Sequence, residues 1–260
     1  MTRVLQQRDG HVLVIELNRP EKKNAADMQL LHELSAVLGE LDRDPELRVG
    51  VICAAGSDFT AGLDLADVAP RIRDGRLGMV AEGGCDPWRM GNGPECRKPV
   101  VVAVNGLCLT LGIELAAASD LVLAASDARF GQIEVARGIL PFGGATLRLP
   151  LRIGWGAAMR WMLGAELHSA EDAYRLGLVQ ELVEPGALRE RALERAHRIA
   201  DQAPLAVQAT LANARAAERA GAEAAAAGLP SALTALMHSE DAQRAVAAYL
   251  SGETPTFVGK

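Results

Sequence analysis

The chain has 260 residues, 49% of them hydrophobic and 23% charged, a composition typical of a folded globular protein and not of a disordered one. Its net charge of −6 argues against a nucleic-acid partner, because phosphate binding draws on clustered lysine and arginine. The N-terminus lacks the long apolar region of a secretory signal, and the four cysteines show no metal-binding or redox spacing, so we expect a cytoplasmic protein with no metal site.

The first half of the chain predicts an α/β domain. Four short runs have the continuous apolar pattern of strands buried in a parallel sheet, and they span residues 12–17, 49–54, 100–104 and 121–125. Asp27 is expected to open a helix, because the apolar residues from Met28 to Leu41 follow it with helical spacing. A further helix is expected at 112–119. Strands and helices in this order indicate an α/β fold.

One apolar stretch, residues 100–118, imitates a membrane span. Asn105, Gly106 and Glu114 interrupt it, and its composition changes from β-branched to alanine-rich. We therefore interpret it as a strand followed by a helix, and expect no membrane association.

Residues 70–97 form the least regular stretch, with six glycines among scattered charges. Two interpretations stay open for it. It is either a mobile lid over a pocket or a surface loop with short helices.

From Pro141 onward the pattern becomes helical. Helices are expected at 154–163 and 169–176, the second beginning at Ser169 and closed by Gly177, with a short strand at 179–183. The alanine-rich stretch 211–227 is also expected to be helical. Alanine-rich helices bury little surface by themselves, so the tail should pack on the main domain or on another subunit. We expect a core domain at 1–195 and a helical oligomerisation region at 196–260.

Two glutamates, Glu114 and Glu134, each lie in an apolar stretch that contains glycine. A carboxylate is costly there unless it is used or paired. Two carboxyl groups in one apolar pocket can have different pKa values, so that one donates a proton while the other accepts one. The alternatives are a first-turn glutamate stabilised by a helix dipole, for Glu114, and a solvated loop carboxylate, for Glu134. We favour acid/base chemistry.

Five segments, in this order and spacing, resemble the enoyl-CoA hydratase/isomerase (crotonase) superfamily. They are LNRPEKKNA (17–25), FTAGLDL (59–65), KPVVVAVNG (98–106), ELAAASD (114–120) and FGQIE (130–134). The resemblance covers nearly the whole chain. It implies a spiral of ββα units, a C-terminal helical region that forms trimers or dimers of trimers, an acyl-CoA thioester substrate and no separate cofactor, since coenzyme A is part of the substrate.

The resemblance also implies roles for individual residues. The backbone N–H groups of Leu63 and Leu111 would form an oxyanion hole for the thioester carbonyl. Glu134 would protonate the α-carbon, and Glu114 would hold and deprotonate the attacking water. The residues implied in coenzyme A binding are Arg19, Lys22, Lys23, Ala61, Gly62, Asp64, Leu65, Phe257 and Lys260.

One departure from the family pattern concerns residues 110–112. Relatives usually carry three glycines before the first glutamate, whereas this chain has Thr110, Leu111 and Gly112. Leu111 keeps its N–H, but its side chain should narrow the pocket or shift the loop. We predict an enoyl-CoA hydratase. The alternatives are a Δ3,Δ2-enoyl-CoA isomerase, which needs only Glu134, and a non-catalytic acyl-CoA-binding homologue.

Overall fold

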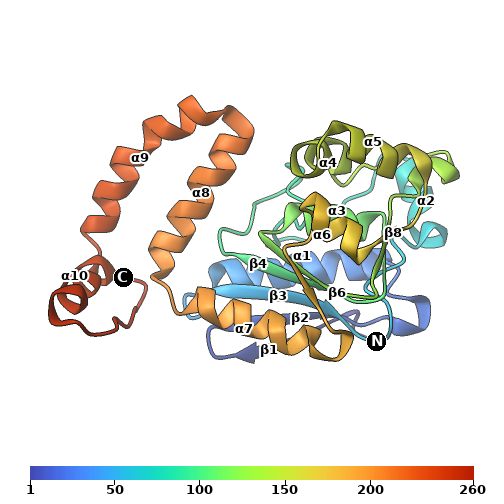
Figure 1. Ribbon diagram of the computed structural model, residues 1–260. Coiled ribbons are helices and arrows are strands. Elements are labelled where there is room, and N and C mark those ends of the chain that lie inside the picture. The colour runs from blue at the N-terminus through green and yellow to red at the C-terminus, as the bar shows by residue number, and fades with distance from the viewer.

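A six-stranded sheet lies at the centre of the structure, a computed structural model that describes all residues from 1 to 260 (Figure 1). Its strand order is β1-β2-β3-β4-β6-β9. Only the pair β1 and β2 is antiparallel, and the other neighbours are parallel. The strands are β1 (Val4–Asp9), β2 (Val12–Leu17), β3 (Val49–Ala54), β4 (Val100–Val104), β6 (Leu121–Ala125) and β9 (Glu181–Val183).

The four strands predicted in the first half of the chain are confirmed as β2, β3, β4 and β6. Every residue of β4 is buried, as a parallel strand covered on both faces requires. The edge strand β1 was not predicted, because only Val4 among its six residues is buried and the rest are polar or exposed. The predicted strand at 179–183 is shorter, and begins at Glu181.

A second, three-stranded sheet brings two distant segments together. It contains β5 (Leu107–Leu109), β7 (Arg129–Gly131) and β8 (His168–Ser169), and β5 runs parallel to β7 with Leu109 opposite Gly131. Helix α3 (Leu111–Ala118) begins just after β5, and the 3₁₀ helix η2 (Glu134–Arg137) begins soon after β7. Pairing of these strands therefore places the start of α3 beside the start of η2.

Helices cover the six-stranded sheet on both sides. Asp27 caps α1 as predicted, since its side chain accepts the N–H of Leu30 at 2.9 Å. Ser169 caps α6 in the same way, and Gly177 closes that helix in the left-handed conformation, with φ of 89°. The helices of this domain are α1 (Met28–Arg43), α2 (Leu65–Arg73), α4 (Ala145–Ile153), α5 (Trp155–Gly164), α6 (Ala170–Leu176) and α7 (Leu188–Ala200), besides α3.

The irregular stretch 70–97 is partly built into the core. Trp88 and Asp86 are each 2% exposed, and the Asp86 carboxylate accepts backbone N–H groups from Trp88, Met90 and Asn92. The interpretation of the whole stretch as a surface loop is therefore wrong for the segment around Trp88, because that side chain fills core space between α1 and α3.

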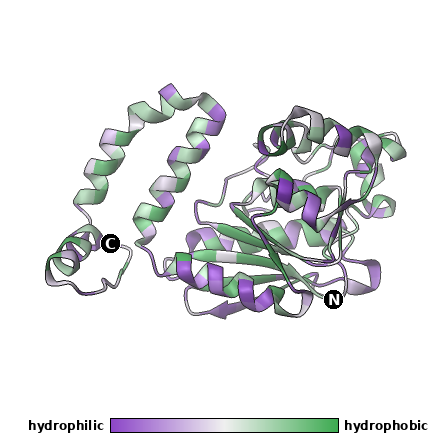
Figure 2. Ribbon diagram, in the orientation of Figure 1, coloured by the Kyte–Doolittle hydropathy of each residue, from purple (hydrophilic) through white to green (hydrophobic).

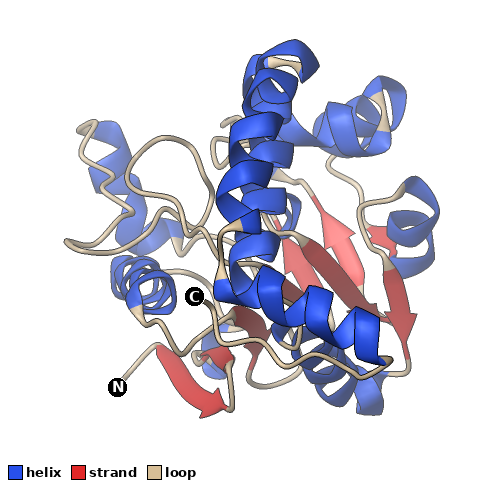
Figure 3. Ribbon diagram, turned by 90° about the vertical axis from the view of Figure 1, so that its left-hand side faces the viewer, coloured by secondary structure: helices blue, strands red, loops and turns tan.

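The last three helices form an arm beside the sheet domain. They are α8 (Pro204–Ala220), α9 (Ala222–Met237) and α10 (Glu240–Ser251). The stretch 211–227 is helical as predicted, but Gly221, with φ of 86° and ψ of 162°, divides it between α8 and α9. Figure 3 views the molecule from the side of this arm, with the strands behind it. None of the helices combines the length and the apolar composition that a membrane span requires.

The arm has little core of its own. Helix α8 contains no buried residue, and the large apolar side chains of Leu229, Leu233 and Met237 in α9 are also exposed. The apolar residues of the arm can be followed in Figure 2. The predicted domain boundary at 195/196 falls within α7, whose Ala196 and Ala200 belong to the main core. We therefore propose that the helical region begins after α7.

Candidate active site

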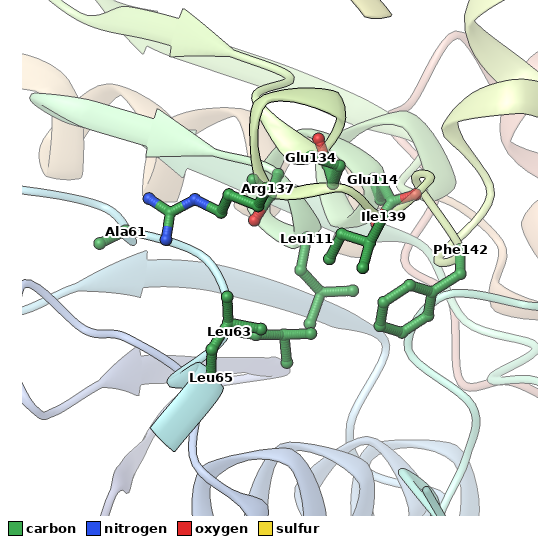
Figure 4. Close-up of a pocket in the computed structure, with 10 residues that line it drawn as sticks. Ala61, Leu63, Leu65, Leu111, Glu114, Glu134, Arg137, Ile139 and Phe142 are labelled. Atoms are coloured by element: carbon green, nitrogen blue, oxygen red, sulfur yellow. The ribbon is translucent and has the colours of Figure 1, made fainter. Parts of the chain in front are cut away.

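A small cavity of about 20 Å³ opens where the loop before α2, the start of α3 and the η2 segment meet (Figure 4). It contains both predicted catalytic glutamates, and its remaining lining is mainly apolar. The lining residues are Ala61, Leu63, Leu65, Thr110, Leu111, Glu114, Glu134, Arg137, Ile139 and Phe142.

Glu114 lies in the first turn of α3 and is 2% exposed. Its Oε1 accepts hydrogen bonds from the backbone N–H groups of Gly143, at 2.8 Å, and Ala145, at 3.1 Å. Burial raises the pKa of this carboxyl to about 7, and repulsion from Glu134 acts in the same direction, while the two N–H groups oppose the shift. A fixed, buried carboxyl with a near-neutral pKa can hold a proton or release it at physiological pH.

Glu134 begins η2, also lines the cavity and is 4% exposed. Its Oε2 is buried and has no hydrogen-bond partner. Burial raises the pKa of Glu134 to about 7, although its own backbone N–H and Arg137 partly oppose this. The alternative of a solvated loop carboxylate is therefore wrong. A buried oxygen with no partner is unusual in a folded protein and is available to a bound molecule.

The N–H groups of Leu63 and Leu111 are both free. Leu111 is the first residue of α3, where the N–H has no partner within the helix, and it donates to no other group. Leu63 lies in a loop anchored to Ala26, because the Ala26 N–H donates to the Gly62 carbonyl at 2.7 Å and Ala26 accepts from Asp64 at 2.9 Å. Two free donors thus line the same cavity as the two carboxyls.

The residue before Leu111 is strained. Thr110 has φ of 48° and ψ of −113°, a conformation that β-branched residues rarely adopt. Its hydroxyl lies against the backbone of Gly62, where a Cβ would stand 1.9 Å from Thr110 Oγ1. Gly62 itself has φ of 90°. The two loops that carry the free N–H groups are therefore packed directly on each other.

The cationic residues implied in coenzyme A binding differ in their surroundings. Arg19 is 9% exposed, and its guanidinium pairs with Asp64 at 2.7 Å and with Asp27 at 3.4 Å. Lys23 is exposed and lies 3.6 Å from Asp58. Lys22 is exposed and forms no ion pair. Arg19 thus stabilises the loop before α2, and phosphate binding by the two lysines stays a prediction.

Phe257 and Lys260 do not approach the cavity within one chain. The Phe257 carbonyl accepts from Arg48 at 2.8 Å, and the Lys260 carbonyl accepts from the N–H of Asp241 at 3.1 Å. Figure 1 shows the C-terminus beside α10, on the far side of the molecule from α2 and α3. Contact of these two residues with coenzyme A stays a prediction.

Several contributors to the site were not predicted from the sequence. Arg137, Ile139 and Phe142 follow Glu134 on the cavity wall, and the N–H of Gly143 holds Glu114. The dipeptide Gly143-Gly144 was the one available signal of close backbone approach. A Cβ at Gly143 would stand 2.6 Å from Glu114 Oε2, which explains why glycine is needed there.

Comparison with known proteins agrees with this geometry. The family model described as Enoyl-CoA hydratase/isomerase matches residues 7–260. A short-chain-enoyl-CoA hydratase from Clostridium acetobutylicum is 36% identical over 211 residues, covering 80% of this chain and 79% of that protein. A 2,3-dehydroadipyl-CoA hydratase from Escherichia coli is 32% identical over 260 residues, covering 100% of both. The crystal structure of a probable enoyl-CoA hydratase/isomerase from Mycobacterium abscessus is 51% identical, with a TM-score of 0.96 over 99% of both chains.

Proposed function

The chain belongs to the enoyl-CoA hydratase/isomerase (crotonase) family, and we propose that it adds water across the 2,3 double bond of a trans-2-enoyl-CoA to give a 3-hydroxyacyl-CoA. One observation carries the proposal. Two buried carboxyls, Glu114 and Glu134, line one cavity together with two free backbone N–H groups. Hydration needs both carboxyls, because one proton leaves water while another reaches carbon.

The reaction follows from this arrangement. The N–H groups of Leu63 and Leu111 donate to the thioester carbonyl and stabilise the negative charge that develops on its oxygen. Glu114 accepts a proton from water as the water oxygen bonds to the β-carbon, and the electrons of the double bond move toward the carbonyl. Glu134 then donates its proton to the α-carbon, which restores the thioester. Glu114 ends protonated and Glu134 ionised, and proton exchange with solvent resets the pair.

The near-neutral pKa values support this division of roles. A general acid or base is most effective when its pKa lies near the working pH, and burial raises both pKa values to about 7. The two N–H groups on Glu114 favour its ionised form, as a base requires. Oε2 of Glu134 has no internal partner, which suits a group that gives its proton to a ligand.

The relatives support the reaction class more than any one acyl group. Two of them are named as hydratases of a short-chain enoyl-CoA and of 2,3-dehydroadipyl-CoA. Their acyl groups differ, but each name describes addition of water to an unsaturated thioester. We therefore assign the present chain to hydro-lyase chemistry on a CoA thioester.

We also propose that the protein acts as a homotrimer or a dimer of trimers. The arm exposes Leu229, Leu233 and Met237 beside an apolar groove between α8 and α9. Such a surface is stabilised when it is covered by another subunit. Phe257 and Lys260 would contact coenzyme A only across such an interface, while Lys22 and Lys23 would meet its phosphates within one chain.

The decisive experiment measures hydration of crotonyl-CoA by the loss of enoyl absorbance, beside isomerisation of a 3-enoyl-CoA. Activity on crotonyl-CoA supports the proposal. Activity only on the 3-enoyl-CoA would favour the isomerase. A dose-dependent rise in melting temperature with acetoacetyl-CoA, without either activity, would favour the non-catalytic binder.

A further inference from the structure

Leu111 has a cavity on each side of its side chain. The first is the catalytic cavity. The second is a small space of about 20 Å³ that lies deeper, between α1, α3 and Trp88. Its lining residues are Leu17, Ala26, Leu30, Leu34, Thr60, Trp88, Leu111, Gly112 and Leu115. Leu111 is the one residue that lines both cavities.

The deeper cavity is apolar and closed off by core residues. Leu30, Leu34 and Trp88 are each at most 2% exposed. The indole N–H of Trp88 donates to the Leu111 carbonyl at 3.1 Å, which fixes the end of the cavity against the start of α3. Nothing charged faces this space, so its lining suits a hydrocarbon chain and not a polar group.

The Leu111 side chain is held in place between the two spaces. It is 4% exposed, and its Cδ1 lies 2.8 Å from the position that a Cβ on Gly143 would occupy. It therefore packs against the loop whose N–H groups hold Glu114. A substrate whose carbonyl is bound at the Leu111 N–H would direct its acyl chain past this same side chain.

We propose that the Leu111 side chain is a partition that ends the acyl site, so that the protein prefers short acyl chains and would accept longer ones if the partition were removed. This inference rests on the proposed function. It names the substrate class of that site, and the residue that sets it. Each methylene that entered the deeper cavity would be buried among apolar side chains, which corresponds to about fourfold in affinity.

The test measures dissociation constants for saturated acyl-CoA thioesters from butyryl-CoA to decanoyl-CoA, which bind without reacting. In the wild type we expect affinity to stop rising beyond the shortest chains. In Leu111→Ala it should continue to rise, by about fourfold for each methylene that reaches the deeper cavity. Leu111→Val removes less side-chain volume, so its affinity should rise with chain length less than that of Leu111→Ala.

Leu34→Ala is the matched control. Leu34 lines only the deeper cavity, so this variant enlarges that space without connecting it to the catalytic cavity. Its chain-length profile should match that of the wild type. A wild type that already gains affinity up to decanoyl-CoA, or a folded Leu111→Ala with an unchanged profile, would overturn the partition.

Hydration of crotonyl-CoA is measured in parallel, so that the two hypotheses fail separately. If the wild type neither binds butyryl-CoA nor hydrates crotonyl-CoA, the proposed function itself is wrong. If it hydrates crotonyl-CoA while Leu111→Ala leaves the dependence on chain length unchanged, only the partition is wrong.

Discussion

The sheet domain and the C-terminal arm differ in how many of their side chains are buried. In β2, β3 and β4 nearly every residue is buried, whereas α8–α10 together bury only Ala225, Asp241 and Ala248. The sheet domain can therefore hold carboxyls in an apolar cavity, because its packing fixes them. The arm is rich in alanine and has too little core to be stable alone. Chemistry should depend on the first region and assembly on the second.

The largest effect is expected from the two glutamates, which test whether chemistry belongs to the sheet domain alone. Glu114→Gln and Glu134→Gln should each lower hydration of crotonyl-CoA by roughly 10²–10⁴, with the double variant little worse, because groups that act as a unit are not additive. Steady-state kinetics measure the loss, and sedimentation should show an unchanged oligomer. Glu171→Gln, an exposed first-turn glutamate of α6, is the control.

The same variants distinguish the rival reaction. An isomerase would lose activity with Glu134→Gln and retain most of it with Glu114→Gln. Hydration near the wild-type rate in Glu114→Gln would contradict the two-carboxyl mechanism.

A somewhat smaller effect is expected from removing one backbone donor. Leu111→Pro eliminates the N–H at the first position of α3, where helices accept proline, and should lower kcat/KM by roughly 10²–10³. Leu111→Ala keeps the N–H and serves as the control for loss of the side chain. Circular dichroism checks that the proline variant is folded. If that folded variant turned over at the wild-type rate, the N–H of residue 111 would have no role.

The arm is tested by a charge on its apolar face. Leu233 is 62% exposed and lines the groove between α8 and α9. Leu233→Asp should dissociate a trimer or hexamer, since the buried leucine would contribute about 1.5–3 kcal/mol at each interface. Light scattering measures the mass. Ser231→Asp adds the same charge at an exposed position of α9 and should leave the assembly intact. A wild type that is monomeric at micromolar concentration would refute the assembly role.

The smallest effect concerns stability and pH. The pKa of Glu134 is raised to about 7 from an ordinary 4.5, so the folded state binds more protons than the unfolded state between these values. Stability of the wild type should therefore fall as pH rises through this window. Glu134→Gln removes that contribution, and its free energy of unfolding relative to the wild type should rise by on the order of 2 kcal/mol between pH 5 and 8. Urea titrations at both pH values measure it, and a pH-independent difference would argue against a raised pKa.

The sequence predicted the parts of the fold that depend on local pattern. Continuous apolar runs identified four strands, and Asp27, Ser169 and Gly177 marked helix ends through their own chemistry. The strand β1 was not predicted, because an edge strand with five exposed residues has no apolar pattern. The break between α8 and α9 at Gly221 was not predicted, because a single glycine among alanine-rich helical sequence is a weak signal of a helix end.

The site was predictable from local pattern only where a residue carries its own signal, while the positions of Leu63 and Leu111 were predicted from the resemblance to a family. A carboxyl in an apolar stretch of sequence is unusual enough to be recognised as a candidate site residue, and both glutamates line the cavity. Ile139, Phe142 and the N–H of Gly143 reach the site through the path of a loop, which local pattern does not specify. The ion pair of Arg19 with Asp64 was not predicted, because a sequence does not show which carboxylate lies nearest.

The contact between Thr110 and Gly62 makes the two oxyanion loops dependent on each other. With threonine at position 110, any side chain at position 62 would collide with its hydroxyl, and Thr110 is held at an unfavourable φ by that packing. A glycine at 110 would relieve the backbone and free space beside 62. A side chain at 62 would still be strained, because Gly62 has φ of 90°. Because the residues at 62 and 110 are in contact, the effects of substitutions at the two positions on stability should not be additive.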